Sequence, residues 1–576
     1  MSTVIDRRRF LQGTAGLAGV AMSAVALDAC GAGKDDDAGA PTESSSGTQA
    51  NSPSTGGMTA PVTTSSGQSP TAGGANSLLP TYVADDKVKP DLMGTADGVA
   101  SGFLAYPQDP PKVTDGTPGK TTAVSAFLMT PGALPPAVSS NKFWQELNKR
   151  LGVDFKANLI PAAEYSAKIA AMVGSGDVPE LTQISAGSVP NLPEALKAMF
   201  TDLTEYLSGD AVKSYPCLAA LPTIAWQSTV YNKGIYGIPF PLGVAGSYAF
   251  LRKDIFAELG APTEITNGDD LKKLFATLTD VKKNRYASCQ PTNVLAYVQL
   301  MLGAPNGWKL DNGAFVSAYE TDEYAQGLDI VSQMWKAGVL HPDSFAGTIQ
   351  FKAALGGGQV PIAFDAYSAW PGYVRDYGTD NPKFALDVLI PPKWDGGGQA
   401  RQYLGSGSYT FVAIKKGKAD RTKELLDIVN WFAAPFGSEE YLFKKYGIAG
   451  YDYTLKGTDP ILTSVGTNEV HLPTSYVANP APFLYEPGLP DVTRQEYGIQ
   501  QKLVPSGVQS PAVGLVSATS TAKGASLTKP LTDAISDIIQ GRKPVSSWSD
   551  VVKTWRNSGG AQVATEFAEA YAALHG

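Results

Sequence analysis

The chain has 576 residues, with 54 acidic and 46 basic side chains and a formal net charge of −8. That length is enough for two large domains together with flexible segments. The acidic balance gives no basic footprint, so we expect no nucleic-acid partner.

The first 29 residues have the arrangement of an export signal. Arg7, Arg8 and Arg9 precede an apolar stretch at 10–27, which contains glycines and a serine and is too weakly apolar to span a membrane. Residues 7–11 resemble a twin-arginine signal. Residues 27–30 resemble a lipobox, which makes Cys30 the expected lipidated first residue of the mature chain. An ordinary secretory signal with an incidental cysteine is the alternative.

Residues 30–119 are rich in Gly, Ser, Thr, Pro and Ala and contain few large apolar residues. Such a segment buries too little apolar surface to offset the entropy cost of ordering. We therefore predict a flexible tether between the membrane and a folded region. Its second half holds the apolar side chains that could lie against that region: Leu78, Leu79, Tyr82, Phe103 and Tyr106.

From residue 120 the pattern alternates between strands and helices. An apolar strand at 123–129 precedes a helix in which Phe143, Leu147 and Leu151 recur, with Ser140 as the expected cap. Alternation at 153–159 predicts a second strand, 164–174 a second helix, and 181–184 a third strand. This order favours a parallel α/β sheet, which binds ligands at the carboxyl ends of its strands.

Similar elements follow to the C-terminus. The spacing predicts strands at 360–364 and 410–414 and helices at 253–259, 269–278, 324–337, 421–433, 531–540, 548–557 and 563–574. No later segment is long and apolar enough to span a bilayer. Cys217 and Cys289 are the cysteines beyond Cys30. They could form a disulfide in an oxidising compartment or remain two separate buried thiols.

Five local patterns occur in one order between residues 121 and 576. They include GSGDVPE at 174–180, GIYGIP at 234–239, GGGQVPIAFD at 356–365, YGIAGY at 446–451 and IQGRKPV at 539–545. Together the patterns resemble the extracellular solute-binding protein family 1, and within it the long lipoproteins of oligosaccharide importers. Glu180 replaces the Asp that is usual in the first pattern.

The resemblance implies a two-lobed α/β fold of the periplasmic-binding-protein type II, with a ligand cleft between lobes that close on the solute. By analogy, lobe 1 comprises 120–244 and 396–450, and lobe 2 comprises 245–395 and 451–576. The implied function is a non-enzymatic receptor, lipid-anchored on the outer face of the bacterial cell membrane. It would act as a monomer without a cofactor, capturing a carbohydrate, specifically an oligosaccharide, for an ABC transporter permease.

A sugar site needs aromatic platforms and polar groups in the plane of the ring. The loop after the strand at 360–364 offers Asp365, Tyr367 and Trp370, and the resemblance places ligand contacts there. Packing beneath the loop is the alternative for both aromatic rings. Further candidates are at other strand ends and crossovers: Thr130, Ser185, Ser188, Trp226, Tyr248, Tyr403 and Ser406. Turn chemistry is the alternative for the Ser and Thr residues, and a structural role is favoured for Trp226.

Catalysis finds little support in the sequence. The histidines, His341, His471 and His575, have no paired spacing, so we expect neither a metal site nor a histidine-based triad. The GSGS run at 405–408 precedes a strand, whereas a nucleophile elbow requires a helix. Acidic loops around 267–270 and 311–323 lack the EF-hand pattern. An envelope glycosidase with paired carboxylates and a receptor for a non-sugar solute such as a peptide remain open.

Overall fold

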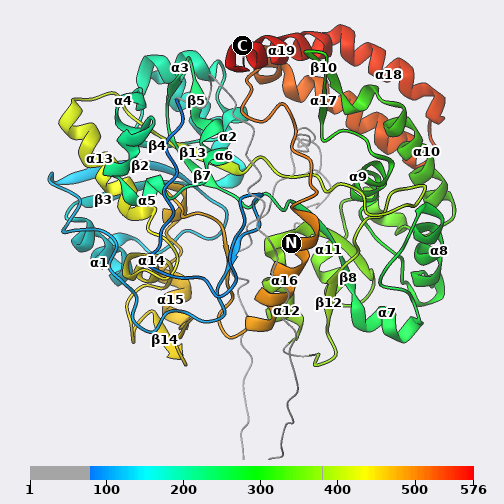
Figure 1. Ribbon diagram of the computed structural model, residues 1–576, viewed down its shortest axis with the longest axis horizontal. Coiled ribbons are helices and arrows are strands. Elements are labelled where there is room, and N and C mark those ends of the chain that lie inside the picture. Colours follow the sequence, from blue (N-terminus) through cyan, green and yellow to red (C-terminus); the bar gives the residue numbers. More distant parts are fainter. Residues whose placement is uncertain (1–77, 379–380, 576) are drawn as a thin grey trace, which may run out of the picture.

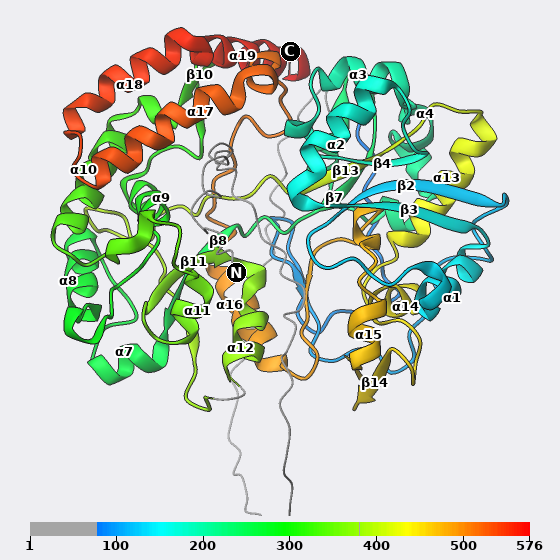
Figure 2. The same ribbon diagram turned by 180° about the vertical axis from the view of Figure 1, so that it is seen from behind.

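Two α/β lobes lie side by side and are joined by several connecting segments, as Figure 1 shows from one side and Figure 2 from behind. The computed structural model describes residues 78–378 and 381–575. The predicted export signal and Cys30 lie outside the described residues. The mixed helices and strands and the two lobes confirm the fold class predicted from the sequence.

Lobe 1 is built on a five-stranded sheet in the order β3-β2-β4-β13-β7. The strands are β2 (Ala123–Thr130), β3 (Asp154–Pro161), β4 (Leu181–Ile184), β7 (Ile238–Pro241) and β13 (Ser408–Ile414). β2 is parallel to β3 and β4, as the sequence predicts. β13 is antiparallel to β4 and β7, because it enters the sheet from a crossover at the edge where β4 ends.

Helices complete lobe 1, and their apolar faces form its core. Phe143, Leu147 and Leu151, the predicted inner face of the first long helix, are fully buried. The cap of that helix is Asn141 rather than Ser140, since the Asn141 side chain accepts the Trp144 backbone N–H at 2.8 Å. The helices are α1 (Lys142–Leu151), α2 (Ala162–Ser175), α3 (Leu192–Met199), α4 (Thr204–Leu207), α5 (Pro216–Ala219), α6 (Thr223–Trp226), α13 (Ala419–Phe432), α14 (Glu439–Tyr446) and α15 (Ser464–Glu469).

Lobe 2 has a three-stranded antiparallel sheet in the order β11-β8-β12, surrounded by helices. Its strands are β8 (Ser247–Arg252), β11 (Ile362–Ala366) and β12 (Leu386–Val388). Its helices are α7 (Lys253–Leu259), α8 (Gly268–Leu278), α9 (Pro291–Leu302), α10 (Asp322–Lys336), α11 (Phe351–Gly356), α12 (Trp370–Gly378), α16 (Pro490–Leu503), α17 (Ala518–Ile539), α18 (Trp548–Trp555) and α19 (Ala561–His575). α17 begins 13 residues before the predicted start at 531, with Pro530 inside the helix. Because proline normally interrupts a helix, the sequence analysis does not predict the first half of α17.

Three segments meet side by side between the lobes, and we call them the hinge: 242–246, 401–407 and 504–510. The Gly405 N–H donates to the Val244 carbonyl at 2.9 Å, and the Leu242 N–H donates to the Gly407 carbonyl at 2.9 Å. The Val508 N–H donates to the Gln402 carbonyl at 2.8 Å. These backbone bonds form a narrow connection between the two sheets.

The chain crosses into lobe 2 for the last time at a later residue than the sequence analysis predicts. The hairpin of β14 (Tyr453–Lys456) and β15 (Asp459–Leu462), followed by α15, stays with lobe 1. Tyr476 and Val477 are also buried in the lobe 1 core. The chain reaches α12 of lobe 2 only with α16. The boundary therefore lies between 478 and 490 rather than at 451, because the hairpin packs on α14 instead of leaving the lobe.

Residues 78–119 of the predicted tether are packed onto the folded lobes, and we call them the strap. Leu79, Phe103 and Tyr106, which the sequence analysis says could lie against the folded region, are buried, whereas Tyr82 is exposed. Tyr106 is buried, and its N–H donates to Asp459 Oδ1 at 2.9 Å. The Ala100 N–H donates to Gln500 Oε1 of α16 at 2.9 Å. The short strand β1 (Ser101–Gly102) pairs with β16 (Phe483–Leu484). A few buried apolar side chains and these acceptors order a segment that its composition alone predicts to be flexible.

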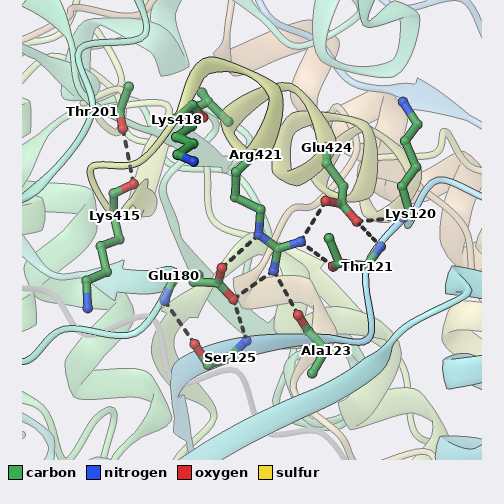
Figure 3. A network of polar contacts seen from close by, with 11 residues as sticks. Lys120, Thr121, Ala123, Ser125, Glu180, Thr201, Lys415, Lys418, Arg421 and Glu424 are labelled. Carbon is green, nitrogen blue, oxygen red and sulfur yellow. Dashed lines mark hydrogen bonds and ion pairs between the residues drawn. The ribbon is translucent and has the colours of Figure 1, made fainter.

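Arg421 of α13 fixes the end of the lobe 1 sheet opposite the hinge (Figure 3). Its guanidinium donates to both oxygens of Glu180, at 2.8 and 2.9 Å, and to Glu424 at 2.7 Å. Glu180 also accepts the Ser125 N–H of β2 at 3.1 Å. Burial raises the pKa of Glu180, but the bonds from Arg421 and Ser125 more than offset this and hold it below its usual value. The Glu that replaces the usual Asp thus links β2, β4 and α13.

Cys217 and Cys289 do not pair. Cys217 is buried in the lobe 1 core, whereas Cys289 is buried in the cluster of lobe 2 beside the hinge, and both are free thiols. Within residues 78–378 and 381–575, no helix combines the length and apolar character needed to cross a membrane.

Candidate ligand-binding site

The ends of several strands meet next to the hinge. In lobe 1, Phe411 of β13 is opposite Ile184 of β4, and Ser408 is opposite Pro241 of β7. The carboxyl ends of β4 and β7 and the start of β13 therefore share one edge, together with the end of parallel β2. In lobe 2, the end of β11 pairs with the start of β8, Ala366 opposite Ser247. The five residues 242–246 join the two edges, which limits the distance between them to about 20 Å.

The predicted Ser and Thr candidates lie on the lobe 1 edge, in loops held by hydrogen bonds. Thr130 is almost fully buried at the end of β2. The Ser185 N–H donates to the Tyr165 hydroxyl at 3.1 Å, and that hydroxyl donates to the Gln183 carbonyl at 2.7 Å. The hydroxyls of Ser188 and Ser166 lie 2.9 Å apart. These contacts fix the loops before any ligand arrives, which is the preorganisation a binding site needs.

Tyr409 on the same edge is an aromatic residue that the sequence analysis missed. Its side chain is 37% exposed, although it is the second residue of a sheet strand. Its ring lies 6.1 Å from that of Phe240 and 6.2 Å from that of Tyr476, and both of those residues are buried. Tyr409 is thus an exposed ring supported from behind by two buried rings. Its place in the sequence, three residues after the candidate Ser406, was the available signal.

Two of the predicted aromatic contacts belong to the core of lobe 2. Trp370 is 1% exposed, and its ring meets that of Phe250 edge-on, with 5.6 Å between centroids. Tyr248 is also 1% exposed. The alternative of packing beneath the loop therefore describes Trp370, and neither Trp370 nor Tyr248 offers a face for stacking. Trp226 is likewise buried in the core of lobe 1.

Tyr367 contacts the hinge, and Asp365 forms its contacts within lobe 2. The Tyr367 N–H donates to the Gly246 carbonyl at 3.1 Å, and its hydroxyl packs so closely on Gly243 that a Cβ there would lie 2.2 Å away. Asp365 accepts the Tyr373 hydroxyl at 2.9 Å and lies 3.9 Å from the Lys352 ammonium. Burial is the largest cause of the raised pKa of Tyr373, and the negative charge of Asp365 raises this pKa further. Asp365 is therefore occupied by protein partners.

The two remaining candidates stand in the hinge. The Tyr403 hydroxyl donates to the Ala304 carbonyl at 2.8 Å, which ties the crossover to lobe 2. Ser406 is exposed, and its hydroxyl donates to the Ser408 carbonyl at 2.8 Å. Their contacts hold the shape of the crossover, and Ser406 remains accessible beside Tyr409.

A buried polar cluster adjoins the hinge on the side of lobe 2. Glu496 of α16 is buried, and among the described residues its Oε1 has no hydrogen-bond partner. Burial, followed by repulsion from Glu486, raises the pKa of Glu496 well above its usual value. Burial is also the largest cause of the raised pKa of Tyr248, and the electrostatic effect of the Glu496 carboxyl raises this pKa further. This cluster places a buried carboxyl with a raised pKa near the crossover.

No metal centre is formed by the part of the chain that the structure describes: it contains no group of three His, Cys, Asp or Glu side chains placed to hold a metal ion. Asn267, at the start of one acidic loop, instead caps α8 by accepting the Asp270 N–H at 3.0 Å. Two lobes with their strand ends directed to a shared hinge have the architecture of a binding protein that closes around its ligand.

Comparison with known proteins agrees with that class. A family model for bacterial extracellular solute-binding proteins matches residues 135–436, more than half of the chain, and the chain belongs to this family. Lipoprotein LipO from Bacillus subtilis (strain 168) is 22% identical over 484 residues, covering 78% of this chain and 92% of LipO. The polygalacturonan/rhamnogalacturonan-binding protein YtcQ from the same strain is 22% identical over 452 residues, covering 74% and 87%.

A solved structure has the same fold. The N-glycan transport solute binding protein NgtS from Streptococcus pneumoniae matches with a TM-score of 0.58 and 14% identity, covering 79% of this chain and 99% of that chain. The predicted family and the predicted two-lobed fold are thus confirmed.

Proposed function

We propose that this solute-binding protein captures an oligosaccharide between its lobes and delivers it to an ABC permease. The observation that carries the proposal is the lobe 1 edge, where the exposed ring of Tyr409 lies beside the hydrogen-bonded serine loops. An aromatic face stacks on the C–H face of a sugar, and hydroxyls and amides satisfy its edge. The names of YtcQ and NgtS, which refer to glycan binding, support the same ligand class.

The proposal includes a location outside the cytoplasm with a lipid anchor at Cys30. Membership of an extracellular solute-binding family and the lipoprotein relative support it. The strap would then connect the anchored segment to the hinge, since Ala100 and β1 contact α16 and β16.

Mass spectrometry of solute that stays with the protein through purification, followed by titration calorimetry with the solute found, tests the proposal. We expect an oligosaccharide that binds reversibly and is recovered unchanged. Release of new reducing ends from that oligosaccharide would instead identify a glycosidase. A bound peptide would contradict the carbohydrate assignment.

A further inference from the structure

The two sheet edges at the hinge carry almost no basic side chains. The described segments 131–141 after β2, 185–191 after β4, 242–246 after β7 and 504–517 after α16 contain neither Lys nor Arg. The segment 366–370 after β11 also contains none. The strand register and the hinge bonds bring these segments together with the third hinge segment, 401–407, whose basic residue is Arg401.

Two cations next to these edges, Arg401 and Lys352, have protein partners. The Arg401 guanidinium donates to the carbonyls of Ser506 and Gly507, at 3.4 and 3.3 Å. Lys352 lies 3.9 Å from Asp365. Lys168 is the seventh residue of α2, which places it about 9 Å along the helix from the first residue after β3. The acidic groups nearby, Glu164 and Asp365, add no positive charge.

This charge pattern restricts the ligand. A polyuronate presents an ionised carboxylate on every sugar, and each carboxylate that leaves water needs a cationic partner or several donors to offset the loss of hydration. The net charge of −8 adds a long-range repulsion for any polyanion. A neutral sugar requires no cationic partner. The face of a tyrosine and uncharged hydrogen-bond donors and acceptors are enough to bind it.

We infer that the ligand is an uncharged oligosaccharide rather than a uronic-acid polymer such as the polygalacturonan in the name of YtcQ. This inference rests on the proposed carbohydrate function and narrows its ligand class. The edge segments contain few basic side chains. This feature distinguishes the chain from a receptor for acidic glycans that has the same fold.

Two sets of short oligosaccharides test the inference by calorimetry at low salt. The neutral set contains xylo-, manno-, malto- and galacto-oligosaccharides, and the acidic set contains oligogalacturonates and alginate oligomers. We expect the tightest ligand in the neutral set and affinities roughly tenfold or more weaker throughout the acidic set. A uronate as the tightest ligand, with an affinity that falls steeply as salt is added, overturns the inference and leaves the carbohydrate function intact. Binding of neither set contradicts the proposed function itself.

Two variants of Arg401 form a matched pair, and calorimetry measures their affinity for the oligosaccharide that binds most tightly. Arg401→Gln removes its charge, and Arg401→Lys keeps the charge while changing the bonds to the 506–507 carbonyls. Equal affinity in both variants and the native protein supports the inference. Weakening in both variants points to loss of the carbonyl bonds and also leaves it standing. Weakening beyond tenfold in Arg401→Gln alone, together with a native affinity that falls steeply as salt is added, shows an ion pair with an anionic ligand and overturns it.

Discussion

Tyr409 and Trp370 are aromatic side chains with opposite surroundings. Tyr409 is 37% exposed at the edge of the lobe 1 sheet, and its ring is supported by Phe240. Tyr409→Ala removes the contact with the sugar face and should weaken oligosaccharide binding about tenfold or more, the effect of losing roughly 1–3 kcal/mol of apolar burial. Calorimetry measures the affinity, and a thermal melt should show little change in Tm.

Trp370→Ala is the contrasting variant, because Trp370 is 1% exposed and packs on Phe250. Truncating a buried Trp costs about 3–5 kcal/mol of stability, so Tm should fall while the affinity of the folded protein stays within a few-fold. The opposite outcome, a stable Trp370 variant without affinity and an unaffected Tyr409 variant, would return the site to the loop after β11.

Glu496 predicts a dependence of stability on pH. Burial and Glu486 raise the pKa of Glu496 in the folded protein well above its unfolded value. The folded state therefore holds the proton more tightly, and the stability that this supplies is present in full below the unfolded pKa and is lost as pH rises through the folded pKa. Glu496→Gln should gain stability at pH 7 to 8 relative to the native protein and differ little near pH 4. Denaturant unfolding at the two pH values measures this, and a gain at pH 4 alone would contradict it.

The sequence places residues at strand ends more reliably than it decides which way their side chains face. Thr130, Ser185 and Ser188 were predicted at the ends of strands, and the structure has them there. Tyr248 and Trp370 also come from the expected segments but point into the core. Ring orientation depends on packing neighbours such as Phe250, which is distant in the sequence from Trp370 and on the same strand face as Tyr248. Whether these residues touch ligand stays a prediction.

At the scale of elements, the Arg421 network joins α13 to β2 and β4 (Figure 3). Burial raises the pKa of Glu180, and the opposing bonds from Arg421 and Ser125 leave it lowered overall. Its contribution to stability is therefore present above the unfolded pKa of about 4.5 and is lost as pH falls through the lower folded pKa. Glu180→Gln should cost about 1–3 kcal/mol of unfolding free energy at pH 7, and this cost should shrink as pH falls below about 4.5 toward the folded pKa. Glu258→Gln, on the exposed side of α7, is the matched control and should change stability little across this pH range.

Periodicity predicts the long elements well and the irregular ones poorly. Strand β4 has the predicted bounds, and β11 is displaced by two residues from the predicted 360–364. The start of α17 and the hairpin β14–β15 were missed or misassigned, and the strap was predicted only through a few apolar side chains that could lie against the folded region. In each case local composition suggests flexibility or a break, while distant partners supply the order, such as Asp459 and Gln500 for the strap.

At the scale of the whole molecule, the anchor should be separable from the binding site. Cys30→Ala removes the proposed lipid attachment and should release the protein from the membrane fraction, with ligand affinity unchanged. Fractionation and calorimetry on the released protein check both parts. A variant that stays in the membrane fraction would contradict lipidation at Cys30.

The hinge connects the two lobes through backbone bonds among 242–246, 401–407 and 504–510. We expect the lobes to rotate about these contacts when a solute binds, with each core kept intact. The strap contacts lobe 1 through Asp459 and lobe 2 through Gln500, so it spans the same region. Closure around a solute is the motion that this architecture favours.

The radius of gyration in solution tests this account most directly. Small-angle X-ray scattering of the protein with and without a saturating amount of the oligosaccharide that binds by calorimetry compares the two states. We predict a smaller radius of gyration with the ligand, because the lobes close on it. An unchanged radius at saturation would contradict binding between closing lobes.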